Sequence, residues 1–189
     1  MKNIAIFASG SGSNAERIFE YFVDSEQINV KLVLCNNPEA GVIQRAERLQ
    51  IPLIIFDRLA FKSGEVVKIL QHNQIDWVIL AGFLWLVPKN VVEAFPNRII
   101  NIHPALLPKF GGKGMYGHFV HEAVVENNET ESGITIHFVN EHYDEGGVIF
   151  QASFPVLYTD IPADVARKGQ VLEHKHFPEV IERTILASV

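Results

Sequence analysis

The chain has 189 residues, of which 48% are apolar and 20% are charged, and this apolar content argues against a disordered chain. Its net charge of −6 argues against a surface built mainly to bind nucleic-acid phosphates, and no apolar run approaches the length of a membrane span. Cys35 is the only cysteine, which excludes an internal disulfide and a cysteine-cluster zinc site. We therefore expect one cytoplasmic domain over residues 1–189, with no nucleic-acid or membrane partner.

Short apolar runs alternate with amphipathic segments in the first half of the chain. Strands are expected at residues 4–8, 30–34, 53–56 and 77–81. Helices are expected at residues 14–19, 41–49 and 64–72. Continuous apolar strands between amphipathic helices are typical of βαβ units, so this half predicts a parallel sheet covered on both faces.

The second half continues this alternation and then changes character. A short helix at 91–95 and a strand at 99–102 are followed by a loop at 109–117 that holds four glycines, and then by a helix at 118–126. Two further strands at 134–139 and 148–156 predict an antiparallel extension. The last helix should run from 162 toward 185, with Pro178 kinking or splitting it.

A glycine-rich turn follows the first strand. Its backbone N–H groups and the helix N-terminus behind it favour a phosphate, and the side chains of Ser11, Ser13 and Asn14 add hydrogen-bond donors. Residues 10–15 also match the dinucleotide-binding fingerprint, but Cys35-Asn36-Asn37 stands where its acidic residue is expected. A dinucleotide-dependent oxidoreductase, a phosphate-sensing module and a purely structural turn remain alternatives at this point.

Two polar residues lie on an apolar strand near its end. Asn101 and His103 are two positions apart, so both side chains face the same side of the sheet. An amide donor and an imidazole together can stabilise the oxyanion of an acyl transfer. The alternative is a structural pair that satisfies the loop around Pro104. His137, on a later strand, is interpreted as a sheet residue whose hydrogen bonds are satisfied locally.

The segment Asn101-Ile102-His103-Pro104-Ala105-Leu106-Leu107-Pro108 closely resembles the signature of the folate-dependent formyltransferases. Residues 10–14, Ala81-Gly82-Phe83, and Asp144 with Gly146-Gly147 extend the resemblance over essentially the whole chain. It implies a three-layer Rossmann-like fold with a mostly parallel sheet and an antiparallel C-terminal extension.

The implied activity is transfer of the formyl group of 10-formyltetrahydrofolate to the amine of glycinamide ribonucleotide in purine biosynthesis. No metal is implied, and a monomer or a homodimer is expected. Relatives that formylate initiator methionyl-tRNA or a nucleotide sugar, and the hydrolase of formyl-folate, carry additional domains and are the alternatives within the family.

The resemblance also implies roles for individual residues. The catalytic residues would be Asn101, His103 and Asp144, with Thr135 near them. The acceptor substrate would be bound by Ser11, Gly12, Ser13, Asn14, Gln170 and Glu173. The folate would be bound by Leu84, Trp85, Leu86, Val87, Asn101, Asn140, Glu141, His142, Tyr143 and Asp144. The loop at 109–117 is longer than the common form and receives no role. Gly64 stands where many members have an arginine, which leaves Lys62 as a possible replacement.

Overall fold

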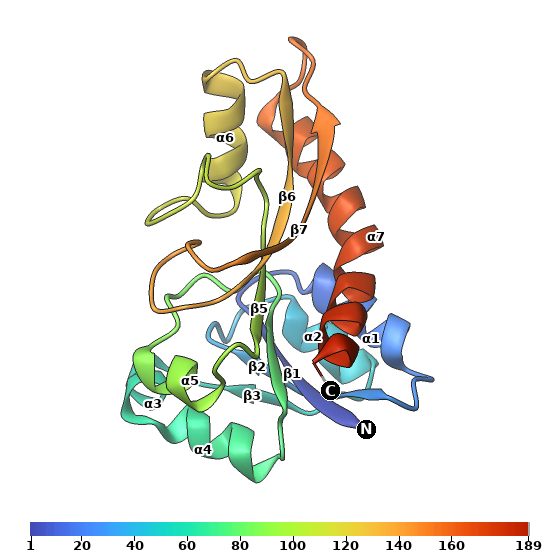
Figure 1. Cartoon of the computed structure of the whole chain (residues 1–189), viewed down its shortest axis with the longest axis vertical. Coiled ribbons are helices and arrows are strands. Elements are labelled where there is room, and N and C mark those ends of the chain that lie inside the picture. Colours follow the sequence, from blue (N-terminus) through green and yellow to red (C-terminus); the bar gives the residue numbers. More distant parts are fainter. Residues whose placement is uncertain (189) are drawn as a thin grey trace.

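Within residues 1–188, which the computed structural model describes, seven strands form one mixed sheet (Figure 1). The strands are β1 (Lys2–Ala8), β2 (Ile28–Cys35), β3 (Leu53–Ile55), β4 (Trp77–Leu80), β5 (Ile99–His103), β6 (Glu131–Phe138) and β7 (Val148–Pro155). Their order is β3-β2-β1-β4-β5-β6-β7, and the pairs up to β5 are parallel while β5-β6 and β6-β7 are antiparallel. This arrangement confirms the predicted α/β class and its antiparallel extension.

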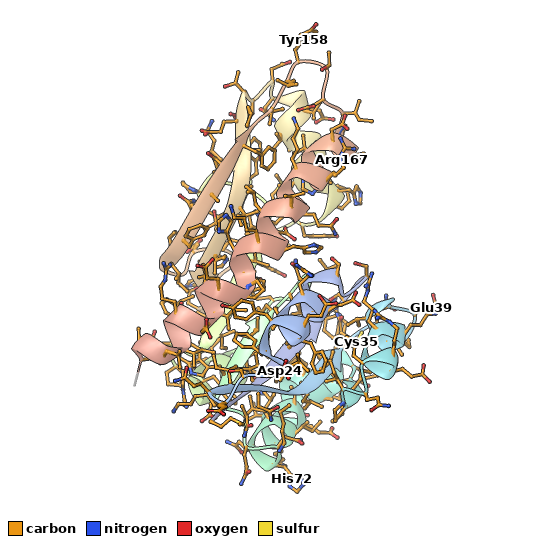
Figure 2. The ribbon with its side chains drawn as sticks, turned by 90° about the vertical axis from the view of Figure 1, so that its right-hand side faces the viewer. Asp24, Cys35, Glu39, His72, Tyr158 and Arg167 are labelled. Atoms are coloured by element: carbon orange, nitrogen blue, oxygen red, sulfur yellow. The ribbon has the colours of Figure 1, made fainter. Side chains whose placement is uncertain are left out.

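Helices cover both faces of the sheet. The helices on one face are α1 (Ser13–Phe22), α2 (Val42–Arg48) and α7 (Pro162–Ala187), and those on the other are α3 (Arg58–Ser63), α4 (Glu65–His72) and α5 (Lys89–Ala94). Helix α6 (His118–Glu126) lies beside the β6-β7 hairpin. The molecule is elongated, with Tyr158 at the hairpin end and His72 at the opposite end (Figure 2). No described helix is both long enough and apolar enough to cross a bilayer.

The helices differ from the sequence-based expectation in two places. Helix α3 was not expected; the side chain of Asp57 caps it by accepting from the N–H of Ala60 at 2.8 Å, and Gly64 ends it with a φ of 89°. A helix of six residues is too short to show a clear period in the sequence. Pro178 does not split the last helix, because α7 is one helix of 26 residues. Burial of Phe177 and Ile181 on either side of the proline holds both halves against the sheet.

Truncation of Phe177 tests the packing of α7 on the sheet. Phe177 is fully buried in the core shared by α1, α2 and α7. Phe177→Ala is expected to lower the free energy of unfolding by about 3–5 kcal/mol, because it removes apolar contacts and leaves a cavity. Urea denaturation measures this loss. Val171→Ala on the exposed side of the same helix is the control and should change stability by less than about 0.5 kcal/mol; equal effects would contradict the packing.

The sheet order creates a crevice at the carboxyl ends of β1 and β4. The chain leaves these two neighbouring strands in opposite directions, toward β2 and toward β5, and such switch points are the usual ligand sites of open α/β sheets. Ser9 joins the two strand ends, since its N–H donates to the carbonyl of Gly82 at 3.1 Å and its hydroxyl accepts from the N–H of Leu84 at 3.0 Å. The glycine turn and the segment after β4 therefore meet at one edge.

Candidate active site

The pairing of β5 with β6 brings four polar side chains together. In this antiparallel register His137 lies opposite Asn101, and Thr135 lies opposite His103. Directly opposed residues of an antiparallel pair share one face of the sheet and have closely spaced Cβ atoms. His137 therefore belongs to the same site as Asn101 and His103.

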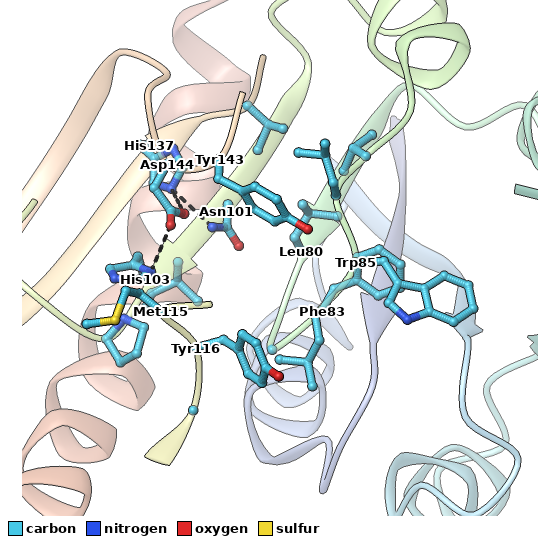
Figure 3. A pocket seen from close by; sticks show the side chains of 18 of the residues that line it. Leu80, Phe83, Trp85, Asn101, His103, Met115, Tyr116, His137, Tyr143 and Asp144 are labelled. Carbon is cyan, nitrogen blue, oxygen red and sulfur yellow. Dashed lines mark hydrogen bonds and ion pairs between the residues drawn. The ribbon is translucent and has the colours of Figure 1, made fainter. Parts of the chain in front are cut away.

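Asp144 lies between the two histidines. Its Oδ2 is 3.5 Å from Nδ1 of His103, and its Oδ1 is 3.6 Å from Nε2 of His137 (Figure 3). His103 and His137 are 4% and 2% exposed, so these contacts are shielded from water. The three predicted catalytic residues converge on one place, together with His137, which the sequence analysis interpreted as a sheet residue.

The loop after β6 positions Asp144 through close backbone contacts. The carbonyl of Gly147 accepts from the N–H of Phe138 at 2.9 Å, and a Cβ atom at Gly146 would lie only 1.6 Å from the carbonyl oxygen of Phe138. Only glycine permits this approach. Asp144 itself has a φ of 55°, a conformation that aspartate tolerates better than most residues, and its Oδ2 accepts from the N–H of Gly112 at 3.0 Å.

The environment of His103 contains two opposing influences on its charge. Burial lowers its pKa, and the carboxylate of Asp144 and the carbonyl of Phe110, which is 2.7 Å from Nε2, offset part of that effect. Burial by itself would raise the pKa of Asp144, but His103 and the N–H of Gly112 are among the groups that lower it, and the resulting pKa lies below its usual value. The site thus pairs an ionised carboxylate with an imidazole that has an acceptor at each ring nitrogen.

His137 orients the side-chain amide of Asn101. Nδ1 of His137 is 2.8 Å from the carbonyl of Phe138, which identifies Nδ1 as the protonated nitrogen. Nε2 then carries a lone pair and accepts from Nδ2 of Asn101 at 3.0 Å. The interpretation of His137 as a purely structural sheet residue missed this contact. His137 and Thr135 are two positions apart on one strand, which indicates that they share a face of the sheet. Only the pairing of the strands connects His137 with Asn101.

Thr135 holds the backbone that follows His103. Its hydroxyl donates to the carbonyl of Ala105 at 2.7 Å and accepts from the N–H of Leu107 at 3.0 Å and from Nε2 of Gln151 at 2.9 Å. It is fully buried and does not line the cavity beside the predicted catalytic residues. It therefore fixes the path of the Ala105 to Leu107 segment.

An apolar cavity opens beside Asn101, His103 and Asp144. Figure 3 shows Tyr143 and Tyr116 on opposite sides of it, with the His103-Asp144 pair at one end and Trp85 toward the other. The predicted folate-binding residues that line it are Leu84, Trp85, Leu86, Val87, Asn101, His142, Tyr143 and Asp144. Asn140 and Glu141 do not line it; Oδ1 of Asn140 accepts from the N–H of His142 at 2.9 Å and so shapes the loop.

The glycine turn meets α7 at the edge of the same cavity. Nε2 of Gln170 donates to the hydroxyl of Ser13 at 3.1 Å, and Nδ2 of Asn14 donates to Oε2 of Glu173 at 2.7 Å. Asn14 and Glu173 both line the cavity, and burial raises the pKa of Glu173. Among the described residues Oδ1 of Asn14 is buried and has no hydrogen-bond partner. These contacts join two distant segments that were predicted to bind one substrate.

Among the described residues, no group of three or more His, Cys, Asp or Glu side chains is arranged so that it could hold a metal ion. The loop at 109–117 contributes Gly112, Gly114, Met115, Tyr116 and Gly117 to the cavity wall. Lys62 is not among the residues that line this cavity.

Comparisons with known proteins agree with this arrangement. Residues 2–181 match the formyl transferase family model. The chain belongs to the formyl transferase family. The chain is 42% identical over 187 residues to the chloroplastic phosphoribosylglycinamide formyltransferase of Arabidopsis thaliana, covering 95% of this chain and 64% of that protein. The chain therefore spans less than two thirds of the length of this plant relative.

Bacterial members of the formyl transferase family match over most of both chains. The phosphoribosylglycinamide formyltransferase of Bacillus subtilis is 33% identical, covering 98% of this chain and 95% of that protein. The crystal structure of the enzyme of the same name from Streptococcus pneumoniae is similar with a TM-score of 0.87 and 33% identity, covering 98% of this chain and 99% of that one. The fold is thus that of known family members.

Proposed function

We propose that this chain transfers the formyl group of 10-formyltetrahydrofolate to the amine of glycinamide ribonucleotide. The convergence of Asn101, His103 and Asp144 beside an apolar cavity is the observation that carries this proposal. The substrate amine attacks the formyl carbon, the bond between that carbon and folate nitrogen 10 breaks, and the proton lost by the amine balances the one gained by that nitrogen. Formylglycinamide ribonucleotide and tetrahydrofolate are the products.

Asn101 stabilises the charge that develops on the formyl oxygen. One N–H of its amide donates to Nε2 of His137, and this leaves the second N–H free to donate to the oxyanion of the tetrahedral intermediate. Because His137 already fixes the Asn101 amide, this amide loses little conformational freedom when the transition state forms. His137 is in this way a positioning residue for Asn101.

His103 supplies positive charge or a proton to the same intermediate. Asp144 favours the imidazolium form, since a carboxylate 3.5 Å from Nδ1 stabilises a charged ring. Nε2 contacts the carbonyl of Phe110, so the substrate replaces this carbonyl when His103 passes a proton to the leaving folate nitrogen. The loop at 109–117 therefore adjusts when both substrates bind.

The two substrates occupy opposite sides of the catalytic residues. The phosphate lies on the N–H groups of residues 11–14 at the start of α1, and Glu173 accepts from ribose hydroxyls. The pterin lies in the apolar cavity against Leu84 to Val87, where backbone groups pair with the polar edge of the heterocycle.

An assay with purified protein and both substrates tests this function. Loss of the formyl-folate chromophore together with formation of formylglycinamide ribonucleotide is expected. Turnover only with water, methionyl-tRNA or an amino sugar nucleotide would assign a different activity of the family. Saturable binding of NAD(P)H with no formyl transfer would instead favour the oxidoreductase alternative.

Asp144→Asn tests the electrostatic pairing through pH. The carboxylate raises the pKa of His103, so its removal should lower that pKa further. If imidazolium is the active form, the rate falls as pH rises through this pKa, and the falling limb of kcat/KM should move to lower pH in the variant. Glu145→Gln, at an exposed position of the same loop, is the control and should leave the limb unchanged. An unmoved limb in Asp144→Asn would contradict the pairing.

A further inference from the structure

The N-terminal half of α2 packs directly against the glycine turn. The N–H of Val42 donates to the carbonyl of Gly10 at 3.1 Å, and Nε of Arg45 donates to the carbonyl of Ser11 at 2.8 Å. At Gly12, where φ is 76°, a Cβ atom would lie 2.5 Å from Cγ2 of Val42. Helix α2 therefore contacts three consecutive residues of the turn.

These contacts decide which way the peptide groups of the turn face. The C=O and N–H of a trans peptide point in opposite directions. Because Arg45 holds the carbonyl of Ser11 toward α2, the N–H of Gly12 in the same peptide points away from α2. The N–H of Val42 likewise holds the carbonyl of Gly10 toward α2, so the N–H of Ser11 in that peptide also points away from α2. In the part of the chain that the structure describes, the N–H groups of Gly12 and Ser13 have no acceptor.

The charge beside the turn is also set by α2. Glu16, in the first turn of α1, is 13% exposed and by itself would repel an anion at the start of that helix. Arg45 and Arg48 both form ion pairs with its carboxylate. Two guanidinium groups paired with the one carboxylate of Glu16 leave one positive charge in surplus in this cluster.

We propose that Arg45 is a positioning residue for the phosphate of the acceptor substrate, and that Arg48 supports the same subsite through its charge. This inference rests on the proposed function, because it concerns the phosphate subsite of that reaction. Arg45 keeps the carbonyl of Ser11 away from the phosphate and keeps the N–H of Gly12 available to it. The surplus charge favours a phosphate dianion over a neutral hydroxyl.

Four variants separate the roles of bond and charge. Arg45→Met removes the bond to Ser11 and the charge, and Arg45→Lys keeps the charge but loses the directional Nε bond. Arg48→Met removes a charge and its pairing with Glu16 but no bond to the turn. Arg17→Met is the matched control, because Arg17 pairs with Glu20 on an exposed part of α1 and its loss changes net charge equally. Thermal unfolding of each variant checks that it is folded. Binding of inorganic phosphate by calorimetry and the KM of both substrates are measured.

Arg45→Met is expected to weaken phosphate binding and raise the KM for the phosphorylated acceptor by about 10- to 100-fold, the range for loss of a charged hydrogen bond. Its kcat and its KM for formyl-folate should change by less than about threefold. Arg45→Lys should recover part of the phosphate affinity, Arg48→Met should lose a few-fold, and Arg17→Met should match the parent protein.

The dephosphorylated acceptor gives the decisive comparison. Glycinamide ribonucleoside lacks the phosphate that Arg45 helps to bind. With this acceptor, Arg45→Met and the parent protein should therefore have the same kcat/KM. An equal loss with both acceptors, or unchanged phosphate affinity in Arg45→Met, would overturn this inference while formyl transfer by the parent protein stands. Absence of formyl transfer in the parent protein would instead overturn the proposed function.

Discussion

Replacement of His103 by alanine is expected to lower kcat by at least about 100-fold, the contribution typical of a general acid–base group. The ring is buried, faces Asp144 and lies at the end of the cavity where the formyl group would react. Steady-state rates with both substrates at saturation measure the loss. A variant that keeps its kcat would remove His103 from the mechanism and would favour a module that only binds phosphate.

Two further variants separate chemistry from loop structure at His103. His103→Gln retains a side-chain N–H that can donate to the carbonyl of Phe110, but it cannot carry a proton between groups. It should therefore be as slow as His103→Ala. His118→Ala, at an exposed position at the start of α6, should keep the parent rate. Recovery of the rate in His103→Gln would mean that holding the loop is the main role of His103.

Replacement of Asn101 by alanine is expected to lower kcat by about 10²- to 10³-fold, the loss found when one oxyanion-hole donor is removed. The KM of each substrate should change only a few-fold, since the amide donates to a charge that exists only in the transition state. Asn101→Asp should be at least as slow, because a carboxylate repels the oxyanion. A rise in KM with an unchanged kcat would contradict the oxyanion role.

The controls for Asn101 test its support by His137. His137→Leu removes the acceptor that holds the amide and is expected to lower kcat by about 10-fold, less than direct loss of the amide. Asn127→Ala removes a side chain that donates to the carbonyl of Ala123 at the exposed end of α6, and it should leave kcat unchanged. If His137→Leu and Asn127→Ala both keep the parent rate, the amide does not depend on His137.

Local features of this protein were predictable from the sequence because they depend on neighbouring residues. The apolar runs and helical periods identified most of the elements, and the spacing of Asn101 and His103 placed them on one face of β5. The glycine turn was recognised from its composition. Two features were not predictable from the sequence. Helix α3 has six residues, which is too short to show a helical period, and the continuity of α7 through Pro178 depends on its packing against the sheet.

The contacts that assemble the site depend on segments far apart in the chain. Asp144 was paired with His103 only through the family resemblance, because nothing in a spacing of 41 residues connects them. Only the register of β5 and β6 places His137 opposite Asn101. Arg45 carried no signal of its own, and only the packing of α2 on the glycine turn revealed its bond to Ser11.

By itself, the sequence determined the α/β class, the turn that exposes backbone N–H groups and the chemical character of the proposed catalytic residues, since these follow from composition and short-range period. Only the tertiary structure decided which charges face one another. Burial between β5, β6 and the loop around Asp144 lowers the pKa of His103, and α2 places Arg45 against Glu16 beside the turn. A chain with a net charge of −6 can thus still bring positive charge to one small site. The interaction energy of two charges depends on the distance between them, and the net charge of the whole chain does not determine it.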